Sequence, residues 1–408
     1  MSLRRTLYKI FFRLSPLFIV VLLELFLRLL GVGESFVIFQ ESGDAQRYEL
    51  NTSHYKRYLS ERQFKDLDIV YQDFSKEKEP DTYRVFLISD HTMISALPET
   101  NKKELLSDFI TPNGKKVDII QLAVPFTNSF AVKEMLRSSK KFNPDACVVL
   151  TGQNEFYGLP KKSVWMRDIR NYWGVSAYVQ AKNFRIIQLL DRFLFVNKDI
   201  SKEFPPEDID AWSVEADSMN YRETFSYFKR NLKTANKNLN YPVFYVNLPV
   251  NIKQQPYRSY FDDKELLDAD FIQECSQLLK KADSYSLDLW LEDLYAWEPE
   301  TAIYYHCKAM IEERNKEQTQ AVEDYWKAVK RDAFKVRMDQ DFRNLLLEVA
   351  QESPNKLIDL EAYLLKDAEG SLNSNDYFKN GLELNEKGGT ALRELIRHEL
   401  SVYFSNKK

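Results

Sequence analysis

The chain has 408 residues, and its 57 basic and 61 acidic residues give a formal charge of −4 at pH 7. A chain of this length can bury a sizeable core, as one large domain with an insertion or as two domains. The nearly balanced charge does not favour a nucleic-acid partner. The three cysteines are widely spaced, without a redox or zinc-ligand pattern, and no glycine-rich phosphate loop is present. We therefore expect no cofactor and no metal.

The N-terminal segment has the composition of a membrane anchor. Residues 14–23 carry no charge, and the apolar run continues to Val32, which approaches the roughly 20 residues that cross a hydrocarbon core. Glu24 and Arg28 interrupt the run, but they lie one helical turn apart and can neutralise each other. Four basic residues precede the run: Arg4, Arg5, Lys9 and Arg13.

These basic residues favour a cytoplasmic N-terminus. The sequence therefore predicts that residues 1–33 form an uncleaved single-pass anchor in a bacterial-type inner membrane, with the C-terminal domain outside the cytoplasm. A cleaved signal peptide is the alternative, although no small-x-small site closes the segment. Residues 34–81 are polar and without a sustained period, and we expect them to form a stalk or lead-in.

The remaining chain, residues 82–408, alternates between apolar runs and helix-sized segments. The runs are rich in β-branched and aromatic residues and lie at 83–88, 117–123, 146–151, 243–248 and 356–360. Strands separated by helices indicate a parallel sheet with helices on both faces. The predicted fold class is α/β, with a doubly wound, parallel, five-stranded sheet. Residues 130–142 are expected to form the helix between the second and third strands.

Two longer stretches interrupt this alternation. Residues 156–239 are aromatic-rich and mostly helical in pattern, and residues 265–335 are expected to form a helical insertion. Two amphipathic helices are predicted within the insertion. Ala302 and Cys307 have helical spacing in the first, and Ala321, Tyr325 and Ala328 have it in the second. Residues 318–332 resemble the second half of a tetratricopeptide repeat, although one such unit cannot support a solenoid. The insertion either packs on the core or docks a protein partner.

Several segments resemble a known family. Val85-Phe-Leu-Ile-Ser-Asp-His91 and Leu150-Thr-Gly-Gln-Asn-Glu-Phe-Tyr-Gly158 resemble the first and third motif blocks of the SGNH (GDSL-type) hydrolases. Tyr245-Val-Asn-Leu-Pro-Val-Asn251 is similar to the fourth strand and following loop of membrane-anchored members, and Asn385-Glu-Lys-Gly-Gly389 to the turn before the last helix. The resemblance covers residues 82–408 except for the insertion. It implies ester hydrolysis at the carboxyl ends of parallel strands.

The family's chemistry uses a serine at the tip of the first strand, with an Asp-x-x-His pair that activates it. Backbone amides and an asparagine stabilise the developing oxyanion. In this chain the serine position falls on His91, which follows Ser89 and Asp90. The position of an oxyanion glycine falls on Phe126, and the oxyanion asparagine is retained as Asn154.

The closing Asp-x-x-His pair is also replaced, because its positions fall on Asn380 and Glu383. The late His398 lies well beyond that place, while His54 and His306 belong to the lead-in and the insertion. No histidine is thus left in position to act as the base of a serine nucleophile.

The favoured interpretation of the replaced site is a hydrogen-bonded polar cluster. If His91 and Glu383 face each other as the serine and histidine would, we expect a hydrogen bond that raises the pKa of His91. One alternative is a divalent-metal site formed by His91, Asp90 and Glu383. The other is catalysis by a relocated serine or by His91 itself.

The sequence therefore predicts a membrane-anchored SGNH hydrolase-like protein that binds or scaffolds at the cell envelope without serine esterase chemistry. The resemblance implies an envelope glycan or lipid as ligand, and the helical insertion is a candidate docking module for a protein partner. The alternative is an acyl-ester hydrolase or acyltransferase that acts on envelope polysaccharide or lipid through a rearranged active site. The fold alone does not decide between these functions.

Overall fold

The computed structural model describes residues 2–44, 46–57, 69–90, 107–158, 172–194, 213–259, 268–297, 299–367, 374–379, 381 and 383–407. The chain divides into two compact units. The first unit comprises Met1–Ile38, Asn51–Asp66 and Pro160–Ile200. The second comprises Phe39–Leu50, Leu67–Leu159 and Ser201–Lys408, and it contains every motif segment named above.

The second unit is built on five parallel strands, which occupy the five predicted regions. They are β5 (Thr82–Ser89), β7 (Lys116–Ala123), β8 (Ala146–Val149), β9 (Val243–Asn247) and β10 (Lys356–Asp359). Their order across the sheet is β7-β5-β8-β9-β10, so the direction of winding reverses between β5 and β8. In an open α/β sheet, ligands bind outside the carboxyl ends of the strands at such a reversal.

The prediction of a purely parallel, five-stranded sheet was wrong. The sheet continues to β3 (Val70–Tyr71), which pairs antiparallel with β7. A further antiparallel strand, β6 (Phe109–Ile110), also pairs with β7 and makes the sheet mixed and seven-stranded. Strands of two residues are too short to produce an alternating pattern, so β3 and β6 could not be predicted from the sequence.

The second unit also contains a three-stranded antiparallel sheet of short strands. Its strands are β1 (Phe39–Glu41), β2 (Arg47–Leu50) and β4 (Phe74–Ser75). Aromatic side chains join this sheet to the rest of the second unit, because the ring centroid of Phe39 lies 5.8 Å from that of Phe86 and 5.1 Å from that of Phe142.

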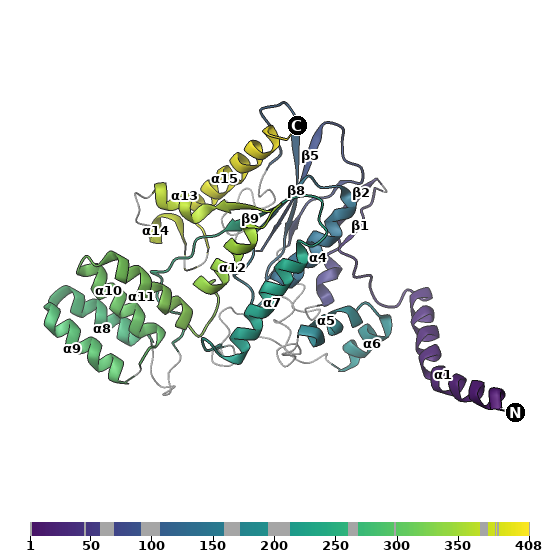
Figure 1. Cartoon of the computed structure of the whole chain (residues 1–408), viewed down its shortest axis with the longest axis horizontal. Coiled ribbons are helices and arrows are strands. Elements are labelled where there is room, and N and C mark those ends of the chain that lie inside the picture. The colour runs from purple at the N-terminus through teal and green to yellow at the C-terminus, as the bar shows by residue number, and fades with distance from the viewer. Residues whose placement is uncertain are drawn as a thin grey trace. The chain divides into compact units, whose positions relative to one another are not determined.

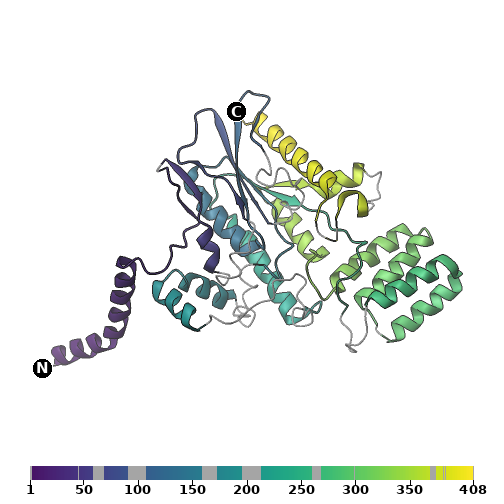
Figure 2. The same cartoon turned by 180° about the vertical axis from the view of Figure 1, so that it is seen from behind.

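Helices cover both faces of the main sheet (Figure 1). On one face, Val85 and Leu87 share a core cluster with α13 (Leu360–Asp367) and α15 (Glu386–Ser405), beside which lies α14 (Ser374–Tyr377). The other face is covered by α4 (Ser129–Ser139), α7 (Met219–Ala235) and α12 (Gln340–Gln351), as Figure 2 shows from behind. Because both faces of the sheet are covered, β5, β8 and β9 are buried throughout and contain long apolar runs.

The helix predicted at residues 130–142 is confirmed. It is formed by α4 and the following 3-10 turn η3 (Lys140–Phe142). The side chain of Asn128 caps α4 by accepting hydrogen bonds from the backbone N–H groups of Phe130 and Ala131. This cap fixes where the loop after β7 ends.

The helical insertion consists of α8 (Asp268–Lys281), α9 (Ser284–Trp297), α10 (Ala302–Arg314) and α11 (Gln318–Arg331). The last two are the predicted amphipathic pair, and they pack closely against each other. A small core joins the helices: Cys275, Leu294, Ile303 and Cys307. All three cysteines of the chain are buried and free of disulfides.

The first unit contains α1 (Ser2–Leu29), the 3-10 turn η1 (Thr52–Arg57), α5 (Tyr172–Ala181) and α6 (Arg185–Leu194). The predicted pairing within α1 is confirmed, because Arg28 Nε donates to Glu24 at 2.8 Å. Leu17, Phe18 and Ile19 on the same helix are each more than 60% exposed. Among the described residues, no helix is both long enough and apolar enough to cross a membrane, so the predicted transmembrane helix is not shown.

Candidate functional site

The candidate site lies at the carboxyl ends of β5, β7 and β8, where the winding of the sheet reverses. Two backbone hydrogen bonds extend the ladder beyond the strands. The Val124 N–H donates to the Ser89 carbonyl at 3.1 Å, and the Leu150 N–H donates to the Ile88 carbonyl at 2.9 Å. The loops that follow the three strands therefore start side by side.

Asp90 and Asn154 meet at this edge. The side-chain amide of Asn154 donates a hydrogen bond to the carboxylate of Asp90, and both side chains are buried. The first motif segment is thus bound to the third across the reversal of the sheet. Both residues come from positions that the sequence singled out, and the sheet order explains why they meet.

Phe126 adopts a backbone conformation that favours glycine. Its φ angle is +61°, in the left-handed region, which costs a residue with a side chain about 1 kcal/mol or more. Its carbonyl is closely packed, because a Cβ atom on Gly158 would lie 2.6 Å from the Phe126 oxygen. The loop after β7 therefore keeps a glycine-type turn although it carries a phenylalanine.

Glu155 fixes the loop after β8 to the start of α4. Its carboxylate accepts hydrogen bonds from the backbone N–H of Ser129 at 2.8 Å and from the Ser129 hydroxyl at 2.7 Å. The Ser129 hydroxyl also accepts from Asn231 at 3.0 Å, and Asn231 accepts from Lys133 Nζ at 2.7 Å. A negative charge at a helix N-terminus is favourable. The Ser129 hydroxyl is thus committed to a buried structural network.

Sequence reasoning missed Glu155, although it directly follows the retained Asn154. The available signal was an acidic residue within a motif block after a buried strand, where an unpaired carboxylate would be costly. The aromatic residues beside it, Phe156 and Tyr157, pack the loop. The Phe156 ring lies 5.8 Å from the Tyr221 ring and the Tyr157 ring lies 4.9 Å from the Phe334 ring.

Ser89, at the end of β5, is fully buried. Its hydroxyl has no hydrogen-bond partner among the described residues, and the same holds for the buried hydroxyls of Thr127 and Thr151 after β7 and β8. Ser89 ends β5, and the two threonines lie in the loops that follow the neighbouring strands β7 and β8. None of them is arranged as an activated nucleophile, because no described side chain accepts its proton.

Two of the predicted site residues, His91 and Asn380, lie outside the described residues, as does the proposed bond between His91 and Glu383. Glu383 itself is described. Its carbonyl accepts from the Lys379 N–H at 2.8 Å, within a hairpin closed by a bridge between Phe378 and Leu384.

Arg337 connects this hairpin to the helical insertion. Its guanidinium donates to the Gln254 carbonyl at 2.7 Å, and to the carboxylate of Asp332 at 2.9 Å, just after α11. A Cβ atom on Gly381 would lie 3.4 Å from Arg337 Cδ. The hairpin, the loop after β9 and the exit of the insertion are therefore packed around one buried cation.

None of the described histidines forms part of a catalytic pair. His306 is buried in α10 with its ring 5.5 Å from that of Tyr325, and burial lowers the pKa of His306 to about 3. His398 is exposed on α15, and His54 Nδ1 lies 2.7 Å from the Phe36 carbonyl in the first unit. Within the part of the chain that the structure describes, no hydrogen bond joins a serine hydroxyl to a histidine ring.

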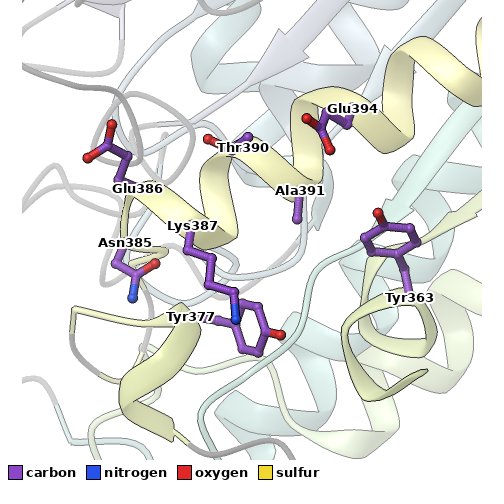
Figure 3. Close-up of a pocket in the computed structure, with 8 residues that line it drawn as sticks. All are labelled: Tyr363, Tyr377, Asn385, Glu386, Lys387, Thr390, Ala391 and Glu394. Atoms are coloured by element: carbon purple, nitrogen blue, oxygen red, sulfur yellow. The ribbon is translucent and has the colours of Figure 1, made fainter. Parts of the chain in front are cut away.

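An open surface cavity of about 680 Å³ adjoins the turn that precedes α15. Its walls come from α13, α14 and the first turns of α15 (Figure 3): Tyr363, Tyr377, Asn385, Glu386, Lys387, Thr390, Ala391 and Glu394. Lys387 Nζ lies 4.3 Å from the centre of the Tyr377 ring, and Asn385 caps α15 by accepting from the Gly388 N–H at 3.0 Å. The sequence indicated the turn at Asn385–Gly389 but not the cavity, because Tyr363 is far from this turn in the sequence.

Metal ligation by His91, Asp90 and Glu383 was one of the alternatives for the strand-end site, and His91 lies outside the described residues. Within the described ranges, no group of three or more His, Cys, Asp or Glu side chains is placed to hold a metal ion. Comparison with known proteins adds no assignment. No protein-family model matches the chain, and no curated protein is significantly similar to it in sequence.

Proposed function

We propose that this protein is an SGNH hydrolase-like binding protein of the cell envelope that performs no serine ester hydrolysis. Three features support the resemblance. The parallel strands have a doubly wound order, Asp90 and Asn154 of the first and third motif segments are hydrogen-bonded, and the loop at Phe126 has a glycine-type backbone. Asp90, Phe126 and Asn154 all follow strands that are neighbours in one sheet, and this supports the resemblance.

The proposed loss of catalysis rests on the burial and hydrogen bonding of the serine hydroxyls near the motif segments. Ester hydrolysis by this family's mechanism needs an accessible serine hydroxyl hydrogen-bonded to a base. Ser89 is fully buried without a described partner, and Ser129 is fully buried and bonded to Glu155 and Asn231. Neither hydroxyl can reach an ester carbonyl in this arrangement, and Ser95, the third serine near the motif segments, lies outside the described residues.

The resemblance makes an envelope glycan or lipid the proposed ligand. The cavity beside α15 supports this proposal through its size, since small-molecule sites usually measure about 300–1,000 Å³. Tyr363 offers an exposed aromatic face with a polar tip, and Lys387, which covers the buried ring of Tyr377, and Glu394 add charged groups. Such a mixture suits a ligand with both apolar and hydroxyl-bearing parts.

Membrane attachment through α1 is part of the proposal. Apolar side chains are exposed along α1 from Leu17 to Leu29, whereas soluble proteins rarely expose large contiguous apolar patches. Flotation with phospholipid vesicles tests this. The full chain is expected to float with the vesicles, and a variant without residues 1–33 is expected to stay at the bottom of the gradient. Equal behaviour of the two proteins would contradict attachment through α1.

Hydrolysis of a p-nitrophenyl ester tests the proposed loss of catalysis. We expect the wild-type rate to equal that of buffer. A variant that restores the family pattern, with His91→Ser, Asn380→Asp, Glu383→His and Phe126→Gly, is expected to hydrolyse the ester. The matched control carries the same changes except His91→Ser. Wild-type hydrolysis that Ser89→Ala abolishes would overturn the proposal.

A further inference from the structure

The helix α9 exposes large apolar side chains on the face that points away from the insertion's core. Tyr285 and Trp297 are each 72% exposed and Leu289 is 44% exposed, whereas Leu287 and Leu294 are buried. By helical spacing, Tyr285 and Leu289 lie opposite the two buried leucines, and Trp297 lies between the two faces. A surface helix ordinarily carries polar residues on the face away from its core. α9 is therefore apolar on both faces.

The exposed side chains form a single line along the helix. Tyr285, Leu289, Asp293 and Trp297 follow one another at intervals of four residues. Side chains at this interval form a ridge, and such ridges pack into the grooves of neighbouring helices. We call these four residues the outer ridge of α9.

The outer ridge is acidic as well as apolar. Asp288 and Glu292 are exposed beside it, Asp293 is exposed within it, and α9 contains no lysine or arginine. An occupant that covers the ridge must therefore bring positive charge, because burying three carboxylates without partners is costly.

The position of α9 fits a docking role. It packs on α10 and lies at the side of the insertion away from α12 (Figure 1). Stacks of helical hairpins normally end in a helix with a polar outer face. Two hairpins are also fewer than the roughly three units that such a stack needs for stability. The outer ridge is thus exposed where one further helix would continue the stack.

We propose that the outer ridge of α9 docks an amphipathic helix of a partner protein, in which lysine or arginine residues flank an apolar stripe. Leu289 and Trp297 would pack against the stripe, and Asp288 and Glu292 would pair with the flanking cations. The aromatic rings of Tyr285 and Trp297 can also receive a cation on their faces. This inference rests on the proposed binding function and names the chemistry of one partner.

The test uses the full chain in neutral phosphatidylcholine nanodiscs and a fluorescent Leu–Lys peptide of about 18 residues, long enough to form a helix. Fluorescence anisotropy reports binding, with empty nanodiscs as the background. We expect the peptide to bind, and the same peptide with glutamate in place of lysine to bind at least about tenfold more weakly. Equal binding of the two peptides would overturn the proposal.

Two variants locate the binding on α9. Leu289→Ser with Trp297→Ser removes the apolar contacts, and Asp288→Asn with Glu292→Gln removes the charges. Each is expected to weaken binding at least about tenfold, since few residues carry most of the energy of an interface. The matched controls change exposed residues of α11, Val322→Ser and Glu323→Gln, and should bind as the wild type does.

Unchanged binding by the α9 variants would refute the outer ridge as the docking site. Self-association of the chain that the apolar α9 variant abolishes would also refute the proposal, since the occupant would then be a second copy. Ester hydrolysis by the wild type would refute the proposed function, but it would not affect the docking proposal, which peptide binding tests separately. The two failures are therefore distinguishable.

Discussion

Removing the carboxylate of Glu155 should destabilise the loops at the carboxyl ends of β7 and β8. Glu155→Ala leaves the backbone N–H and the hydroxyl of Ser129 without their acceptor, in a place where both residues are buried. Hydrogen bonds to a charged group contribute about 1.5–3 kcal/mol each. We therefore expect the free energy of unfolding of the second unit to fall by about 3–5 kcal/mol, including the lost helix-terminus interaction.

Urea unfolding measures this loss, with hydrogen exchange of the α4 amides as a local readout. The α4 amides should lose protection before those of β5, because the change breaks the connection at the start of α4. Glu323→Ala, at an exposed position on α11, is the matched control and should change the stability by less than about 0.5 kcal/mol. A loss below about 1 kcal/mol for Glu155→Ala would refute the reasoning.

Two further predictions concern buried charges around the insertion. Because burial holds the folded pKa of His306 near 3, the unfolded chain binds a proton at His306 below about pH 6.5 and the native chain does not. Stability therefore falls as the pH decreases, and between pH 7 and 5 the wild type should lose about 2 kcal/mol more than His306→Gln in urea unfolding. If the free energies of unfolding of the wild type and His306→Gln changed equally with pH, the native histidine would titrate normally, and the prediction would be contradicted. Arg337→Met breaks a buried ion pair with Asp332 and should cost about 3–5 kcal/mol. Arg331→Met breaks a half-exposed pair and should cost less than about 1 kcal/mol, so equal losses from the two variants would contradict this assignment.

The sequence was most informative about the central strands. The strands β5, β8 and β9 are buried along their whole length, so each contains a long apolar run that is easily recognised in the sequence. The antiparallel additions β3 and β6 contain two residues each, and their pairing with β7 depends on tertiary contacts that no local pattern records. The capped helix α4 and the turn η3 were predictable because the helical pattern runs up to Asn143-Pro144, where a proline disfavours its continuation.

The candidate site was predictable only in part. The motif segments placed Asp90 and Asn154 at strand ends, and the order of the strands then brought them together. The sequence could not show that the backbone at Phe126 keeps a positive φ, because nothing in a phenylalanine indicates it. The role of Glu155 depends on Ser129, which lies 26 residues earlier in the chain.

The central claim is that no serine of this protein acts as an ester-cleaving nucleophile. Its most direct test is the intact mass of the wild-type chain after incubation with a fluorophosphonate, which forms a covalent adduct with activated serines. We expect the mass to remain that of the unmodified chain. A single adduct that maps to one serine, and that disappears when this serine is replaced by alanine, would contradict the claim.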